Sequence, residues 1–114
     1  MAKQKQLVRD AFREAVFKRD GNKCRICSKP ASKYKLDAHH ITDRHLMPNG
    51  GYVASNGISL CDGENGCHMK AEQFHISGGK RWVEGLHPND LYRIIGSSYD
   101  KAYRDSQRLL KGLK

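Results

Sequence analysis

Large apolar side chains and long apolar runs are scarce in this chain of 114 residues. It has one Trp and three Phe, and hydrophobic residues make up 38% of it. No apolar run approaches the roughly 18–20 residues that a membrane-spanning helix requires, so we expect no membrane partner. The polar N-terminus lacks the apolar centre of a signal peptide, which predicts a cytoplasmic protein. A single domain of residues 1–114 with so small a core is expected to need an additional cross-link.

Acidic residues are also few, with 12 Asp and Glu against 21 Lys and Arg. The basic excess lies at the two ends, with seven basic against three acidic residues in 1–23 and eight against four in 80–114. The middle of the chain, residues 24–79, is nearly neutral. A basic surface attracts a polyanion such as nucleic acid. The charge by itself also fits a protein that it merely keeps soluble.

The pattern of apolar residues predicts an α+β fold with a helix at each end. Apolar residues at helical spacing predict a helix over 4–19, within a basic N-terminal region of residues 1–23. The expected order in the core, residues 24–76, is a strand over 34–41, a polar loop over 42–55, a second strand over 57–61 and a helix over 67–75.

The last part of the chain, residues 77–114, is predicted to be a basic helical extension. Pro88 stands where a first helical position is expected. Ser97 and Asp100 form a pattern resembling a capping box, which predicts a further helix from Tyr99 to the end of the chain.

Four cysteines form two groups, Cys24-x2-Cys27 and Cys61-x5-Cys67, with no cysteine left over. Tetrahedral zinc binds four thiolates well, and a CxxC turn delivers two of them from one short segment. We therefore expect one structural Zn²⁺ held by all four cysteines. Two disulfides or a redox-active CxxC remain alternatives, although a cytoplasmic protein rarely forms disulfides.

Histidines and an asparagine occur between these cysteines in a recognisable order. The segments are Asp37-Ala38-His39-His40-Ile41, Asn56-Gly57-Ile58-Ser59-Leu60-Cys61 and Cys67-His68-Met69-Lys70-Ala71-Glu72. Together they resemble the HNH endonuclease family, in its branch with four zinc-binding cysteines, over roughly residues 12–76. The resemblance implies a small ββα-metal core, a hairpin followed by a helix, tied by the cysteine-bound zinc.

The resemblance also implies roles for individual residues. His40 would be the general base and Asn56 the residue whose side chain holds the loop that orients it. His39 and His68 would bind a catalytic divalent ion, with Glu72 as a further candidate ligand. Mg²⁺, Mn²⁺, Ni²⁺ and Zn²⁺ are all candidates for that ion, and imidazole ligands disfavour Mg²⁺.

Neighbouring residues of a strand point to opposite faces, so His39 and His40 could address one phosphate only if the strand ends or twists there. Asp37 and His39 share a face and form an alternative active pair. His68, Glu72 and His75 stand at helical spacing along one side. Of these, Glu72 is the nearer candidate ligand and His75 a more distant one, which we expect to be structural instead.

Hydrolysis of DNA is the function that the resemblance implies, with products ending in 5′-phosphate and 3′-hydroxyl. DNA is then the expected partner, with no small-molecule substrate. Four basic residues could bind phosphates: Arg44, Lys70, Lys80 and Arg81. Trp82 is expected to be a core residue, although it could stack on a base, and His45 and His87 are expected to be packing or surface residues. A zinc module that binds nucleic acid without cleaving it is the first alternative, and a zinc domain that binds another protein is the second.

Overall fold

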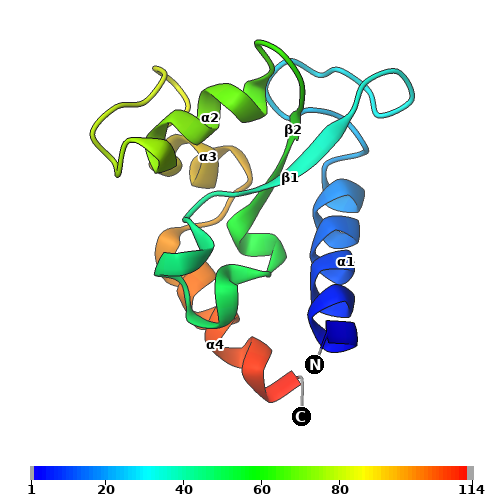
Figure 1. Cartoon of the computed structure of the whole chain (residues 1–114), viewed down its shortest axis with the longest axis vertical. Coiled ribbons are helices and arrows are strands. Elements are labelled where there is room, and N and C mark those ends of the chain that lie inside the picture. Colours follow the sequence, from blue (N-terminus) through cyan, green and yellow to red (C-terminus); the bar gives the residue numbers. More distant parts are fainter. Residues whose placement is uncertain (1, 113–114) are drawn as a thin grey trace.

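The computed structural model describes the backbone of residues 2–112 and the side chains of residues 5–109. Four α-helices and a two-stranded antiparallel sheet make up its regular structure, together with three short 3₁₀ helices (Figure 1). The α-helices and strands in chain order are α1 (Ala2–Arg19), β1 (Leu36–His40), β2 (Gly57–Cys61), α2 (Cys67–Ile76), α3 (Pro88–Ile94) and α4 (Tyr99–Gly112). The fold is therefore α+β, as predicted.

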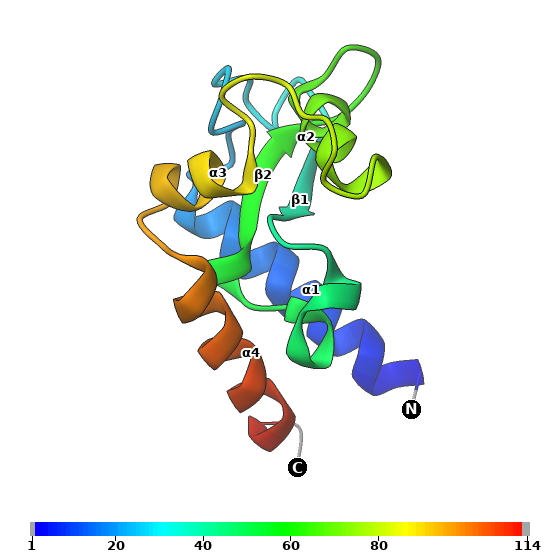
Figure 2. The same ribbon diagram turned by 90° about the vertical axis from the view of Figure 1, so that its left-hand side faces the viewer.

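The two strands lie in the middle of the molecule, with α1 on one side and α2 and α3 on the other (Figure 1). In the view of Figure 2, α2 lies beside β1, and α4 runs away below the strands. The strands pair from Leu36 opposite Cys61 to His40 opposite Gly57. The pairing therefore puts the end of β1 directly beside the start of β2.

Helix α1 approaches the strands most closely at Gly57. A Cβ atom on this residue would stand 2.6 Å from a methyl group of Val16 and 2.7 Å from the ring of Phe12. Both side chains are buried on the apolar face of α1. Glycine at the start of β2 therefore allows a helix to pack against the strand end that carries His40.

The core between the strands and the other helices is built from aliphatic side chains. Ile41, Ile58 and Leu60 are fully buried, and Leu91 brings α3 against them. Buried Leu or Ile side chains of this kind each contribute about 1.5–3 kcal/mol by leaving water. This core holds the hairpin, α2 and α3 in place relative to one another.

Two parts of the chain around the hairpin differ from the sequence-based expectation. The first strand begins at Leu36 rather than Tyr34, because the N–H groups of Lys33 and Tyr34 turn back to the carbonyl of Pro30. The segment 42–55 is not a plain loop but holds the 3₁₀ helices Arg44–Leu46, Pro48–Gly51 and Ala54–Asn56. No helix in residues 2–112 is long and apolar enough to cross a membrane.

The start of α4 is capped by a different serine from the one expected. Ser98 Oγ accepts a hydrogen bond from the N–H of Lys101 at 3.0 Å, as an N-cap does. Ser97 instead donates to the carbonyl of Ser55 at 2.8 Å and ties the helix start to a 3₁₀ helix. The last two residues of the predicted helix, 113–114, lie outside the described residues.

Asp20, at the end of α1, joins three parts of the chain. Its fully buried carboxylate accepts hydrogen bonds from Arg19, from Arg25 in the cysteine loop and from the backbone N–H of Ser59 in β2, at 2.7–2.9 Å. Burial raises the pKa of Asp20, but these hydrogen bonds outweigh it and lower the pKa overall. The carboxylate therefore holds α1, the cysteine loop and β2 together in its charged form.

We expect Asp20→Asn to lower the free energy of unfolding by about 2–4 kcal/mol at neutral pH, because it leaves a buried hydrogen-bond network incomplete. The pKa of Asp20 is depressed by folding, so its contribution is complete above the unfolded pKa of about 3.9 and is lost as pH falls through the lower folded value. Thermal unfolding of both proteins between pH 7 and pH 3 measures this. The two curves should begin to approach each other below about pH 4, whereas Asp10→Asn, on the exposed face of α1, should change stability little.

Candidate functional site

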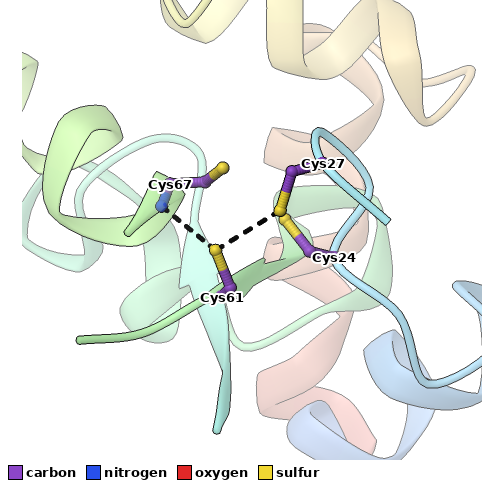
Figure 3. Close-up of side chains that lie close together, drawn as sticks. All are labelled: Cys24, Cys27, Cys61 and Cys67. Atoms are coloured by element: carbon purple, nitrogen blue, oxygen red, sulfur yellow. Dashed lines mark hydrogen bonds between the residues drawn. The ribbon is translucent and has the colours of Figure 1, made fainter. Parts of the chain in front are cut away.

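Four cysteine side chains converge at the far end of the hairpin (Figure 3). Cys24 and Cys27 come from the loop after α1, Cys61 ends β2 and Cys67 begins α2. Their sulfur atoms all lie within 4.8 Å of one another. Four thiolates at this separation could hold one zinc ion and would leave no open position for a substrate.

The chemistry of the cluster fits a metal rather than disulfides. Cys27 and Cys61 have their sulfur atoms 3.6 Å apart, well beyond a disulfide bond, and all four cysteines are free. Burial raises the pKa of the Cys24 thiol, but the backbone N–H groups of Cys27 and Ile26 outweigh it and lower the pKa to about 7. Since the thiolate is the metal-binding form, these N–H groups favour it at Cys24, whereas burial and the neighbouring cysteines raise the pKa of Cys27 and of Cys67.

A cleft of about 500 Å³ opens at the other end of the hairpin. Six of the residues lining it come from β1 and α2 and carry groups that can bind metal or transfer protons: Asp37, His39, His40, His68, Glu72 and His75. Asp43, Arg44 and His45, which follow β1, complete its rim. The strand end, α2 and the first 3₁₀ helix therefore bring the histidines and acids of the motif to one place.

Side chains of one subset of these residues lie close enough to share a cation. The ligand atoms of His39, Glu72 and His75 all fall within 4.8 Å of one another. His39 Nδ1 lies 3.2 Å from Glu72 Oε1, but the two are not aligned as a hydrogen bond, and Nδ1 is buried without a partner. Burial lowers the pKa of His39 more than the neighbouring carboxylate raises it, so the ring is neutral and able to bind a metal.

His75, expected to be structural, therefore belongs to this cluster. Its ring stacks on that of His39 with centroids 5.2 Å apart. Its Nε2 lies 2.9 Å from the carbonyl oxygen of His40 and must be the donor there. In a neutral ring this leaves the free lone pair on Nδ1. His75 thus joins the end of α2 to the backbone of the candidate base.

His68 lies beside this cluster rather than within it. Its Nε2 is 3.1 Å from Asp37 Oδ2 and 3.4 Å from Glu72 Oε1, and its Nδ1 is 3.6 Å from Asp62. The hydrogen bond with Glu72, and the charges of the three acids, raise the pKa of His68. His39 and His68 together hold the pKa of Glu72 well below its usual range. Glu72 is therefore charged and contacts both histidines.

His40 reaches the same cleft from the opposite face of β1. Its ring stacks on Phe12 of α1 with centroids 4.6 Å apart and meets the edge of Tyr52 at 4.7 Å. Burial, followed by the electrostatic effects of the His39 ring and of the Arg44 charge, lowers the pKa of His40 to about 4. The neighbouring histidines do point apart, as strand geometry requires, but β1 ends at His40 and both line one cleft.

The side chain of Asn56 fixes the segment that follows His40. Asn56 is fully buried, and its amide donates to the carbonyls of Thr42 and Gly51 at 3.1 and 3.2 Å. Its Oδ1 accepts from the N–H of Thr42 at 3.0 Å and from the hydroxyl of Tyr92 at 2.7 Å. The asparagine thus has all its hydrogen bonds made, three of them to the chain around the cleft.

No protein family, curated protein or solved structure matches the chain. The meaning of the site therefore rests on its own geometry.

Tyr92 lies outside the sequence prediction, because it comes from α3, beyond the motif. His75 was expected to be structural and was only a more distant candidate ligand. Lys70, Lys80 and Arg81, expected to bind phosphates, are exposed but do not line the cleft, whereas Arg44 does. Trp82 is not a core residue, because 49% of it is exposed. His87 is a packing residue that also caps α3, its Nδ1 accepting from the N–H of Asn89.

Proposed function

We propose that this protein is a metal-dependent endonuclease of the HNH type, which hydrolyses phosphodiester bonds in DNA. The hairpin followed by α2 would be its ββα-metal core, and the four cysteines would hold its structural zinc. One observation carries the proposal. Within residues 5–109, two buried side-chain polar atoms lack a hydrogen-bond partner, His39 Nδ1 and His40 Nε2, and both residues line the same cleft.

Unpartnered buried polar atoms are costly, so a pair of them at one site calls for a functional explanation. The unpartnered Nδ1 of His39 indicates a cation site, because a charged carboxylate and a third candidate ligand, His75, lie beside it. His40 is suited to proton transfer, because its ring is neutral at pH 7 and lies across the strand end from that cluster. A base and a cation site in one cleft are what phosphodiester hydrolysis needs.

The residues fit a divalent ion at His39, Glu72 and His75, with His68 close to Glu72 as a further ligand. Two or three imidazoles with one carboxylate suit Mn²⁺, Ni²⁺ or Zn²⁺ better than Mg²⁺. When bound, such an ion supplies neutralisation of charge on the phosphate and on the departing oxygen.

The protein's own residues perform the proton transfer in this proposal. His40 accepts a proton from the water that attacks phosphorus. Its pKa of about 4 makes it a weak base in the free protein, but an entering phosphate brings negative charge beside the ring and raises that pKa. Asn56 holds Thr42, two residues after His40, and the His75 ring holds the carbonyl of His40. The base is therefore held at its side chain, by the rings of Phe12 and Tyr52, and at its backbone, by His75.

A plasmid cleavage assay tests the proposal directly. Supercoiled DNA should be converted to nicked or linear DNA when Mn²⁺, Ni²⁺, Mg²⁺ or Zn²⁺ is added, and should remain intact without an added ion. We expect the transition ions to support the faster cleavage, because the ligand set contains imidazoles. Failure of all four ions to support cleavage would contradict the proposal. Cleavage at the same rate without added ion would contradict the role of the metal.

A further inference from the structure

A second group of polar side chains lies beside the candidate base, on the side away from α2. Its centre is Tyr52, whose ring meets His40 edge-on at 4.7 Å and Phe12 at 5.7 Å between centroids. Gly50 makes this ring position possible, because a Cβ atom there would stand only 2.6 Å from the ring. The ring of Tyr52 is thus held between Phe12 of α1 and Gly50, against the ring of His40.

Two arginines from distant parts of the chain converge on this hydroxyl. Arg44, at the rim of the cleft, has its Nη1 3.4 Å from the phenol oxygen. Arg9, from α1, is the second guanidinium group near this hydroxyl. Burial raises the pKa of Tyr52, but Arg44 and Arg9 outweigh it and lower the pKa overall. Both arginines therefore favour negative charge at this oxygen.

Neither guanidinium group forms an ion pair with a carboxylate among the described side chains, and the nearest acidic neighbour of Arg44 is Asp43 in the preceding position. Five other arginines of the described chain each lie within 4.0 Å of a carboxylate oxygen: Arg19, Arg25, Arg93, Arg104 and Arg108. Arg9 and Arg44 form no such pair among residues 5–109, and both are exposed. Like charges brought together without a counter-ion repel one another. Their convergence on one oxygen therefore leaves a place where an anion would be stabilised.

We propose that Arg9, Tyr52 and Arg44 form a binding site for one backbone phosphate of DNA, adjacent to the phosphate that is attacked at His40. Two guanidinium groups and one hydroxyl offer several donors to the oxygens of a phosphate, and arginine matches that geometry with paired hydrogen bonds. The site would hold the DNA strand at α1 and at the rim of the cleft, so that the next phosphate of that DNA strand enters between His40 and the cation cluster. This inference takes the identity of its ligand from the proposed nuclease function.

Binding of DNA in the absence of cleavage tests the site. A short fluorescent duplex is titrated with full-length protein carrying His40→Ala, without added divalent ion, and anisotropy is recorded over a range of salt concentrations. Arg9→Gln and Arg44→Gln should each weaken binding about fivefold to tenfold. Replacing both arginines together should reduce the slope of log affinity against log salt by about one unit, as the loss of one phosphate contact does. Circular dichroism and zinc content show whether each variant is folded.

Two comparisons distinguish a shared phosphate from general attraction. Arg93→Gln is the matched control, because Arg93 already pairs with Asp90 at 3.3 Å, and it should change affinity by less than about twofold. The double variant of Arg9 and Arg44 should lose less affinity than the product of the two single losses, since both arginines bind the same phosphate.

Single losses no larger than that of the control, or fully multiplicative losses in the double variant, would overturn the inference. The outcome is separate from that of the plasmid assay. If the protein cleaves no plasmid but the arginine variants show coupled losses of binding, the nuclease function is wrong and the phosphate site stands. If the protein cleaves plasmid but those losses are absent, only the phosphate site is wrong.

Discussion

His40→Ala should reduce the rate of plasmid cleavage by a factor of about 10²–10⁴, the range that a general base contributes. Alanine removes the group that accepts the proton of water, while the cation cluster on the opposite face of β1 keeps its three ligands. The ring packs on Phe12, so some stability is lost as well. The measurement is therefore the single-turnover rate of folded protein, with zinc content and circular dichroism recorded for each sample.

His45→Ala is the matched control, because His45 also lines the cleft but is exposed and lies outside the cation cluster. It should keep its rate within about threefold of the unaltered protein, a small effect of the kind that surface substitutions have. Unchanged cleavage by His40→Ala would move the role of base to another residue of the cleft. The pair of Asp37 and His39 would then be the first to test, by Asp37→Asn.

Much of the fold could be predicted because local rules and the motif agree. The apolar spacing of α1 predicted its helix, and the cysteines predicted where the hairpin is tied at its far end. The start of β1 was misplaced because a local turn at Pro30 takes the N–H groups of Lys33 and Tyr34. Segment 42–55 was predicted only as a loop, since its short 3₁₀ helices are stabilised by long-range contacts. One example is the hydrogen bond from Asn49 to the carbonyl of Ser106, 57 residues away.

The site was predictable where residues lie in the motif and not where other elements add to it. His39, His40 and Glu72 line one cleft, as expected from their order in the chain. The spacing placed His75 on the same side of its helix, but only the three-dimensional distance to His39 shows that it can share a cation. Tyr92 contacts Asn56 across 36 residues, and no local sequence pattern predicts such a contact.

A zinc ion at the cysteine cluster would couple the two ends of the hairpin. The cluster brings together the loop after α1, the end of β2 and the start of α2. Because β2 pairs with β1 along its whole length, an ion there would help to fix the strand end at which His40 and Gly57 meet. Helix α2 starts at one cluster with Cys67 and delivers Glu72 and His75 to the other. Zinc at the cysteines would therefore orient the cleft without contacting substrate.

Cys61→Ser is the substitution with the largest expected effect on stability. Cys61 is the central sulfur of the cluster, buried, 3.6 Å from Cys27 Sγ and accepting a hydrogen bond from the N–H of Cys67 at 3.3 Å. Structural zinc contributes about 10–16 kcal/mol of apparent binding free energy in small zinc domains, and that energy drives folding. We expect the variant to lose its zinc and to show no cooperative thermal unfolding, as measured by metal analysis and circular dichroism.

Ser32→Ala, in the exposed loop between Cys27 and β1, should keep both the zinc and the unfolding transition. A chelator added to the unaltered protein should reproduce the effect of Cys61→Ser, whereas a reducing agent should not. If the cysteines instead formed two disulfides, the reducing agent would lower the unfolding temperature and the chelator would leave it unchanged. The two reagents thus separate the two chemistries, because a metal bound by thiolates depends on the ion and not on an oxidised sulfur pair.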